Sequence, residues 1–333
     1  RELAKLRDNV RVPYNIETIK KDLPTNLSIE SKSISNGSIA TVHLGKYNEK
    51  EVIIKVKRDN IETQIKNTLF YWEYFAYFSS FIPVIKKFNF YQKFKILKRI
   101  VLSQCDFITE IESLQSFKKS YSNLIKIPKV YPEVSNNNFI VMEYLPGISM
   151  DNMLETVTKD EKKEMIKIFY GFLVSSINIK GLFHCDLHSG NFSWKKENGQ
   201  IQLILYDFGM VGKLSPDKLT VLNNFYYNLI TKNLDKTIES LNNIIIKNNI
   251  INESDNKLFN FELRSILIDK FKNKQIQVIG WISEIIYLVN KYDLTLHDDF
   301  TDFELATICF EGVLMQLSSN DQEYIDLMKE ILL

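Results

Sequence analysis

Two short polar segments contain residues whose types and spacing fit phosphoryl-transfer chemistry. The first runs from His184 to Asn191, with Asp186 five positions before Asn191, and the second is Asp207-Phe-Gly, directly after a strand-like run. Transfer of a phosphoryl group from ATP needs Mg²⁺ held by hard oxygen ligands and a carboxylate that positions the acceptor. We therefore expect Asp186 to take the acceptor proton or orient a water molecule. We expect Asn191 and Asp207 to bind Mg²⁺.

Lys55 lies in a strand-like run of residues 52–57 and is a candidate ligand for the α- and β-phosphates. Strand alternation predicts two faces. The apolar face contains Val52, Ile54 and Val56, and the opposite face contains Ile53, Lys55 and Lys57. Taken alone, Lys55 is better explained as a solvated strand residue, but its position upstream of the two acidic motifs reverses this and favours a functional role. A carboxylate must then hold it. We expect Glu110, on a helix around residues 105–117, with Asp106 one turn earlier as the alternative.

Two further segments are candidates for nucleotide contacts, and neither motif is specific by itself. Small residues precede a strand at Ser35, Asn36, Gly37 and Ser38. Their backbone N–H groups could close over phosphates, with Gly37 supplying the conformational freedom of glycine. At the end of another strand-like run, the backbone of Glu143 and Leu145 could hydrogen-bond an adenine edge.

The elements that must position these residues change character along the chain. We expect an α+β, protein-kinase-like fold of two lobes. Residues 1–145 form a small β-rich lobe with a helical insert at about 59–121, and residues 146–333 form a larger, mainly helical lobe with both acidic motifs. Within this plan we expect strands in 33–57, with a turn at 46–50, and at 130–134, 139–144 and 201–206, and a helix at Ile16–Leu23.

The segment Phe70–Phe78 is unusually aromatic for a helix. Burial against the lobes is the ordinary explanation of such a helix, and contact with a membrane or lipid is the alternative. We expect burial.

Bulk composition limits the classes of function. With 45% hydrophobic and 25% charged residues and a net charge of +1, the chain is an ordinary globular protein without a global field for nucleic acid. Its three cysteines are scattered, which indicates an intracellular, reducing compartment rather than a disulfide framework or a zinc site. Apolar runs fall short of the roughly 18–20 residues of a membrane span. Because the chain begins at Arg1, an upstream targeting segment, and with it an organellar or membrane-associated location, stays open.

In this order, the motifs resemble those of the UbiB/AarF/ADCK group of atypical protein-kinase-like proteins, over nearly the whole chain. The matching segments are Ser35–His43 with A-A-A-S-I-A-Q-V-H, Val52–Arg58 with V-A-V-K-V-Q-R, Cys105–Glu110 with x-D-F-x-x-E, His184–Asn191 with H-x-D-x-H-x-G-N, Asp207–Gly212 with D-F-G-M-V-G, and the helical Phe310–Val313. The resemblance implies a kinase-like fold, bound ATP and Mg²⁺, and ATPase or small-molecule kinase activity linked to isoprenoid-quinone and membrane-lipid processes. It also supports Glu110 as the partner of Lys55.

The chain departs from the family pattern at four places. The K-x-G-Q helix of the family would lie upstream of Arg1, and Gln104 replaces a glutamate associated with that helix. Asn36 and Gly37 replace alanines of the small-residue loop, and Ile53 replaces the alanine that faces adenine, which is expected to narrow the pocket.

The segment after Gly209 is short: it reaches Leu214-Ser-Pro216 without an A-P-E triplet, so a platform for protein substrates is not expected. We expect a small or lipid acceptor, or ATP hydrolysis coupled to a conformational change. Two other functions stay open. One is a small-molecule phosphotransferase similar to aminoglycoside or choline kinases, which share H-x-D-x-x-x-x-N. The other is a nucleotide-binding pseudokinase or scaffold, which Ile53 favours and the intact polar set disfavours.

Overall fold

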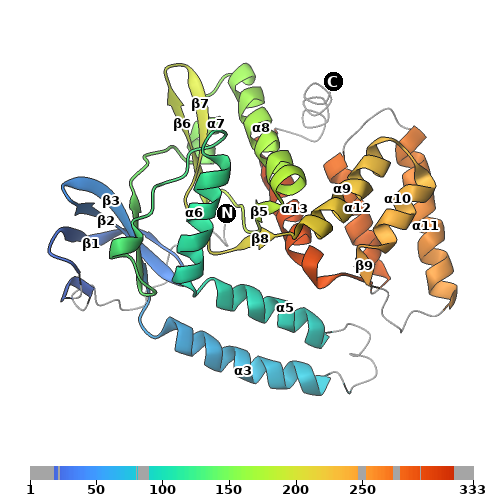
Figure 1. Ribbon diagram of the computed structural model, residues 1–333, viewed down its shortest axis with the longest axis horizontal. Coiled ribbons are helices and arrows are strands. Elements are labelled where there is room, and N and C mark those ends of the chain that lie inside the picture. Colours follow the sequence, from blue (N-terminus) through green and yellow to red (C-terminus); the bar gives the residue numbers. More distant parts are fainter. Residues whose placement is uncertain are drawn as a thin grey trace. The chain divides into compact units, whose positions relative to one another are not determined.

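The structure is a computed structural model that describes residues 19–21, 23–79, 81, 90–246, 253–272, 278–292 and 294–318. It divides into two compact units, drawn in Figure 1. Unit 1 comprises Arg1–Pro146 and Leu205–Met210, and unit 2 comprises Gly147–Ile204 and Val211–Leu333. The segment Leu205–Met210, which the sequence analysis assigned to the helical lobe, therefore groups with unit 1.

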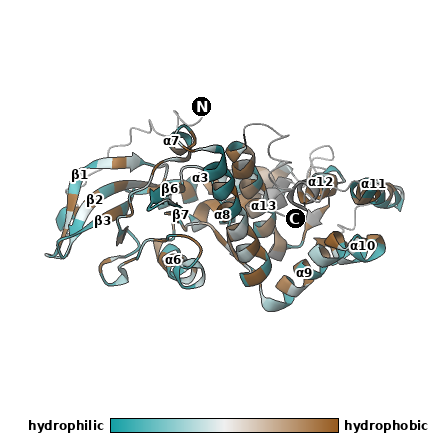
Figure 2. Cartoon of the chain, turned by 90° about the horizontal axis from the view of Figure 1, so that it is seen from above, coloured by the Kyte–Doolittle hydropathy of each residue, from teal (hydrophilic) through white to brown (hydrophobic). Residues whose placement is uncertain are grey.

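Unit 1 is built on a four-stranded antiparallel sheet in the order β1-β2-β3-β4. The strands are β1 (Leu27–Asn36), β2 (Ala40–Tyr47), β3 (Lys50–Lys57) and β4 (Phe139–Glu143). Hydrophobic and hydrophilic residues alternate along them (Figure 2), and one face forms a core in which Val52, Ile54 and Val56 are fully buried. The predicted alternation of β3 is thus confirmed. Asn48 and Glu49, both with positive φ, make the tight turn between β2 and β3.

In the described part of the insert between β3 and β4, the α-helices are α3 (Ile61–Ser79), α5 (Phe90–Ser103) and α6 (Phe107–Tyr121). Helices α3 and α5 lie side by side as a hairpin (Figure 1), with Leu69 and Ala76 packed against Phe94. An ion pair of 2.6 Å between Glu73 and Lys98 joins the two helices.

The expected burial of Phe70–Phe78 is wrong for the aromatic residues. All seven aromatic side chains of this segment are 47–73% exposed, and only Ala76 is fully buried. The reason is that, among the described residues, the apolar core of α3 is formed with α5, which covers one side of α3 and leaves most of its circumference exposed.

Unit 2 is mainly helical. Around Phe310 of α13, Phe169 and Phe172 of α8 pack with ring centroids 5.2 and 5.7 Å away. Its helices are α7 (Met150–Leu154), α8 (Lys159–Val174), the π-helical η2 (Ser175–Lys180), α9 (Pro216–Ile230), α10 (Leu234–Asn242), α11 (Glu253–Lys272), α12 (Val278–Lys291) and α13 (Asp298–Leu317). The strand pairs are β5 (Leu182–His184) with β8 (Val211–Lys213), β6 (Phe192–Glu197) with β7 (Gln200–Leu205), and β9 (Ile245–Ile246) with β10 (Thr295–Leu296).

The α+β class, with a small antiparallel sheet in one unit and a mostly helical second unit, is as predicted. The expected strand 130–134 is wrong: Val130 makes an isolated bridge to Met142, and Pro132–Val134 forms a 3₁₀ turn, since proline favours a helix start and cannot donate to a ladder. Of the expected helix Ile16–Leu23, residues 19–21 are helical, and most of the remainder lies outside the described residues. In the part of the chain that is described, no helix has both the length and the apolarity to cross a membrane.

Candidate active site

Lys55, Glu110 and Asp207 meet in unit 1 through their side chains. The Lys55 ammonium donates to both Glu110 carboxylate oxygens, at 2.7 and 2.8 Å, and to Asp207 Oδ2 at 2.9 Å. The three residues come from β3, from the first turn of α6 and from the segment just after β7. The structure therefore contains the pairing of Lys55 with Glu110 that the sequence favoured, and it adds Asp207 as a second partner.

Burial makes this cluster electrostatically unusual. The Glu110 side chain is 1% exposed, that of Lys55 14%, and that of Asp207 37%. Burial alone would lower the pKa of Lys55, but the charges of Asp207 and Glu110 outweigh burial and raise this pKa, so Lys55 stays protonated. Burial raises the pKa of Glu110 to about 7; the Asp207 charge adds to the rise, and Lys55 opposes it. Asp207 carries the more exposed of the two carboxylates.

Local capping explains how Glu110 reaches Lys55. Asp106 caps α6 by accepting from the Thr109 N–H at 3.1 Å and from the Thr109 hydroxyl at 2.8 Å. Asp106 is thereby a helix cap rather than the partner of Lys55, and it fixes the first turn in which Glu110 lies.

The start of α6 is further held by Asn137, whose side-chain oxygen accepts from Phe107 N–H at 3.1 Å and from Lys57 Nζ at 2.9 Å. The Lys57 ammonium also lies 4.8 Å from the centre of the Phe107 ring. The sequence analysis missed Asn137, because it signals only a turn.

The Asp207-Phe-Gly segment is fixed to α6 from the other side. The Phe208 ring packs on Phe117 with centroids 5.2 Å apart, and the Gly209 N–H donates to Asp207 Oδ1 at 2.9 Å. An added Cβ at Gly209 would lie 3.3 Å from that oxygen and 3.6 Å from Glu110 Oε2. Both Asp207 oxygens are thus oriented by hydrogen bonds.

The small-residue loop connects β1 to β2. Ser35 and Asn36 end β1, Gly37 N–H donates to the Ala40 carbonyl at 2.9 Å, and Ser38 lies at the turn. Gly37 does not adopt positive φ, so this turn does not use the conformational freedom expected of it. The Arg58 side chain donates to the Gly37 carbonyl at 3.0 Å and connects the loop to the residue that follows β3. Ile53, in the middle of β3, is half-buried.

Glu143 is the last residue of β4, and Leu145 lies just before Pro146, where the first segment of unit 1 ends. The Glu143 N–H donates to the Lys129 carbonyl at 2.7 Å, so it is already engaged. The Tyr206 hydroxyl donates to the Leu145 carbonyl at 2.9 Å. These bonds leave the Glu143 carbonyl and the Leu145 N–H as the backbone groups to consider for an adenine edge.

In unit 2, Asp186 and Asn191 lie in the loop between β5 and β6. The Asn191 side-chain nitrogen donates to the Asp186 carbonyl at 2.7 Å, which leaves the amide oxygen of Asn191 as its acceptor atom. The fully buried His184 accepts from Asp186 N–H at 3.1 Å through Nδ1, and this bond braces the loop.

His188 also lies beside Asp186. Its Nδ1 accepts from the Gly190 N–H at 3.0 Å, so a neutral ring carries its proton on Nε2. That Nε2 lies 3.8 Å from Asp186 Oδ2. The segment after Gly209 is short, as expected: β8 pairs with β5, and Ser215 caps α9.

Comparison with known proteins identifies the family. The model of the ABC1 atypical kinase-like domain matches residues 19–241. The chain belongs to this family. Among named relatives, "Protein ACTIVITY OF BC1 COMPLEX KINASE 7, chloroplastic" of Arabidopsis thaliana is 25% identical over 72% of this chain and 36% of its own length. "Probable protein kinase UbiB" of Blochmanniella pennsylvanica is 24% identical over 96% of this chain and 58% of its own length.

The predicted membership in the UbiB/AarF/ADCK group and the kinase-like fold are both confirmed. A solved structure, the Rv3197–erythromycin complex of Mycobacterium tuberculosis, matches 87% of this chain and 77% of its own with a TM-score of 0.53. At 15% identity, this likeness concerns the fold alone. The chain spans less than two thirds of the length of both named relatives.

Proposed function

We propose that this ABC1-family chain binds ATP with Mg²⁺ and acts as an atypical phosphotransferase or ATPase. The observation that carries the proposal is the Lys55 ammonium held between Glu110 and Asp207. A lysine fixed by a helix carboxylate is the group that orients nucleotide phosphates in kinase-like enzymes. With two carboxylates within 3 Å in a largely buried site, Lys55 stays charged and immobile.

Asp207 and Asn191, each taken by itself, have the donor chemistry of a magnesium ligand. Mg²⁺ prefers hard oxygen donors, and it is bound by one or two carboxylates together with substrate phosphates. Asp207 offers a partly exposed carboxylate, and Asn191 offers the amide oxygen that its own hydrogen bond to Asp186 leaves over. When bound, the ion would supply charge neutralisation of the phosphates. A purely protein-made cage is not required, and among the described residues no group of three His, Cys, Asp or Glu side chains forms one.

Asp186 is the proposed residue that accepts the proton of the acceptor hydroxyl or orients a water molecule. Its backbone is fixed on both sides, by His184 and by Asn191. The His188 Nε2 lies 3.8 Å from the Asp186 carboxylate.

The nucleotide contacts are proposed as follows. The loop Ser35–Ser38 contacts the phosphates, and Ile53 contacts the adenine face. The Glu143 carbonyl and the Leu145 N–H bind the adenine edge.

The absence of a long segment after Gly209 favours a small or lipid acceptor, for which an isoprenoid-quinone-related process is the proposed context. Two relatives are named as chloroplastic, which favours an organellar location. A nucleotide-binding pseudokinase is the second candidate, favoured by the branched Ile53 at the adenine face.

The first experiment measures melting temperature with and without ATP and Mg²⁺. We expect a rise for the starting protein and none for Asp207→Asn, whereas Asp151→Asn, an exposed change on α7, should keep the rise. No rise for the starting protein would refute both nucleotide-dependent candidates.

Phosphate release then separates the two candidates. An active enzyme should lose turnover but keep ATP binding in Asp186→Asn, while a pseudokinase would release no phosphate in any variant. Adding phenolic or lipid acceptors to the same assay distinguishes transfer from hydrolysis.

A further inference from the structure

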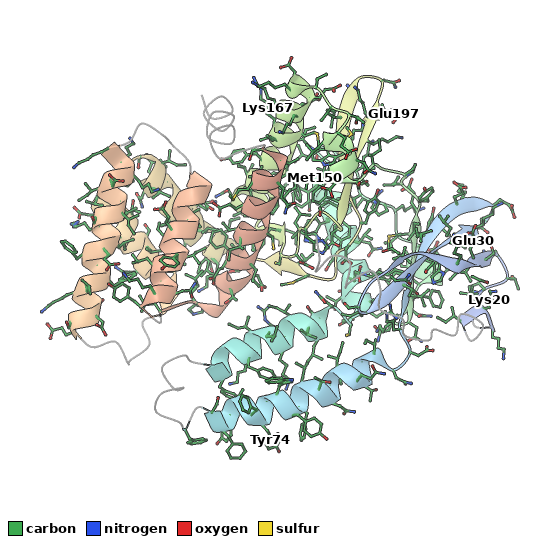
Figure 3. All side chains as sticks on the ribbon, turned by 180° about the vertical axis from the view of Figure 1, so that it is seen from behind. Lys20, Glu30, Tyr74, Met150, Lys167 and Glu197 are labelled. Atoms are coloured by element: carbon green, nitrogen blue, oxygen red, sulfur yellow. The ribbon has the colours of Figure 1, made fainter. Side chains whose placement is uncertain are left out.

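Helix α3 carries an aromatic surface that the proposed catalysis does not use. Six side chains compose it, and we name this set the aromatic face: Phe70, Tyr71, Tyr74, Phe75, Tyr77 and Phe78. All six are exposed. At 100° per residue they cover the half of the helix opposite Leu69 and Ala76, the residues that pack toward α5. Figure 3 shows Tyr74 pointing away from α5.

The rings of the aromatic face contact one another, so they form a continuous patch rather than scattered residues. The Phe70 and Tyr74 rings lie 4.8 Å apart, Tyr74 stacks on Phe78 at 6.5 Å, and Tyr77 lies 5.3 Å from Phe81. Contiguous exposed apolar surface of this kind marks an interaction site in soluble proteins. Three of the six rings are tyrosines, which place an apolar ring and a polar hydroxyl together, as residues at a membrane–water boundary do.

The charge of the hairpin identifies the occupant. From residue 74 to residue 105 the sequence contains no Asp or Glu, and its basic residues are Lys86, Lys87, Lys93, Lys95, Lys98 and Arg99. Lys95 and Arg99 are exposed one helical turn apart on α5. The chain as a whole carries only +1, so this excess of positive charge is local. An exposed aromatic surface beside a basic segment is the combination that binds an interface with anionic headgroups.

A second copy of the chain suits the surface less well. A symmetric dimer through the aromatic face would bring two basic segments without acidic residues toward each other, and like charges oppose such a contact.

We propose that the α3–α5 hairpin binds the surface of a bilayer that contains anionic lipids, with the aromatic face entering the headgroup region. The basic residues of α5, which packs on the other side of α3, attract the anionic surface over a distance comparable to the Debye length. The helix lies on the surface and does not cross it, since Glu62, Lys66 and Glu73 interrupt α3. The proposal stands independently of nucleotide chemistry.

The test is co-sedimentation of the full chain with vesicles of phosphatidylcholine containing phosphatidylserine, and with vesicles of phosphatidylcholine alone. The variant is Tyr71→Ser/Tyr74→Ser/Phe78→Ser. The matched control, Tyr227→Ser/Phe261→Ser/Tyr287→Ser, also replaces two tyrosines and one phenylalanine, at exposed positions in unit 2. Because all six positions are exposed, both variants should melt close to the starting protein.

We expect the α3 variant to lose vesicle partitioning by roughly tenfold or more, and the control to lose little, because binding follows the buried apolar area. A second variant, Lys95→Gln/Arg99→Gln, should weaken binding only to vesicles with phosphatidylserine, whereas Lys119→Gln on α6 should not. Equal binding of the α3 variant and the control would overturn the proposal. So would a concentration-dependent dimer that the α3 variant abolishes while vesicle binding persists.

Discussion

Replacing Lys55 by methionine tests the electrostatics of the buried cluster most directly. The change keeps the length of the side chain and removes the only cation within hydrogen-bond reach of Glu110 among the described residues. Two carboxylates are then left together, one of them 1% exposed. Loss of one partner of a buried ion pair costs about 3–5 kcal/mol. Since Asp207 is partly solvated, we expect a value near the lower end, about 3 kcal/mol at pH 8.

The sign of the pH dependence follows from the Glu110 pKa. Burial already raises this pKa above the ordinary 4.5, to about 7. Without Lys55, which lowers it, the pKa rises further. A carboxyl with a raised folded-state pKa contributes stability below its unfolded pKa that is lost as pH rises through the folded value. The deficit of Lys55→Met relative to the starting protein should therefore shrink as pH falls from 8 toward 5.

The assay is urea unfolding of the full chain at a series of pH values, with Lys119→Met on α6 as the exposed control. The double variant Lys55→Met/Glu110→Gln should recover about half of the loss at pH 8, because a neutral amide replaces the unpaired charge. If Lys55→Met matches the control at pH 8, or if its deficit grows toward pH 5, the cluster does not hold the charges described.

Four further predictions concern local structure. Burial lowers the pKa of His43 below 6.5, so the folded state resists protonation of this ring. The free energy of unfolding should therefore fall as pH drops below about 6.5, by up to about 1.4 kcal/mol per pH unit. His43→Gln should flatten this slope in urea titrations. Thr158→Ala removes the capping box of α8 and should cost about 1 kcal/mol by urea unfolding, and a cost near zero would contradict the capping role. Gly45→Ala would place a Cβ 2.2 Å from the Ser28 carbonyl and should destabilise by about 1–3 kcal/mol. Gly171→Ala, with nothing within 4 Å, should instead stabilise α8 by roughly 0.5–1 kcal/mol in the same measurement.

The features that could be predicted from the sequence were those set by local periodicity or by the order of motifs along the chain. The alternation of β3 follows from a period of two, and it placed Lys55 on the face opposite Val52, Ile54 and Val56 without tertiary information. The Lys55–Glu110 pair spans 55 positions. No local rule reaches that far: the helix offered Glu110 with Asp106 as the alternative, and the family resemblance supported Glu110.

The failures came from tertiary context. Sequence periodicity does not say how many neighbours a helix has, so the exposure of the aromatic face was not predicted. The conformation of Gly37 was also not predictable, because composition shows where glycine freedom is available but not whether a turn uses it. Asn137 was missed for a similar reason: its role depends on the start of α6, thirty positions away in the chain.

The grouping of Leu205–Met210 with unit 1 has a consequence for biosynthesis. A nascent chain that has passed Pro146 contains Lys55 and Glu110 but not Asp207, and it lacks the Phe208 ring that packs on Phe117. Unit 1 therefore cannot complete its core in the order of synthesis, unlike an N-terminal domain that folds as soon as it leaves the ribosome. Until residue 210 has emerged, Lys55 has one charged partner instead of two, and Phe117 has one aromatic neighbour fewer. The Asp207-Phe-Gly segment is thus synthesised after the rest of unit 1 and completes its contacts. Unit 1 of ribosome-bound chains should become protected from protease only after this segment has emerged.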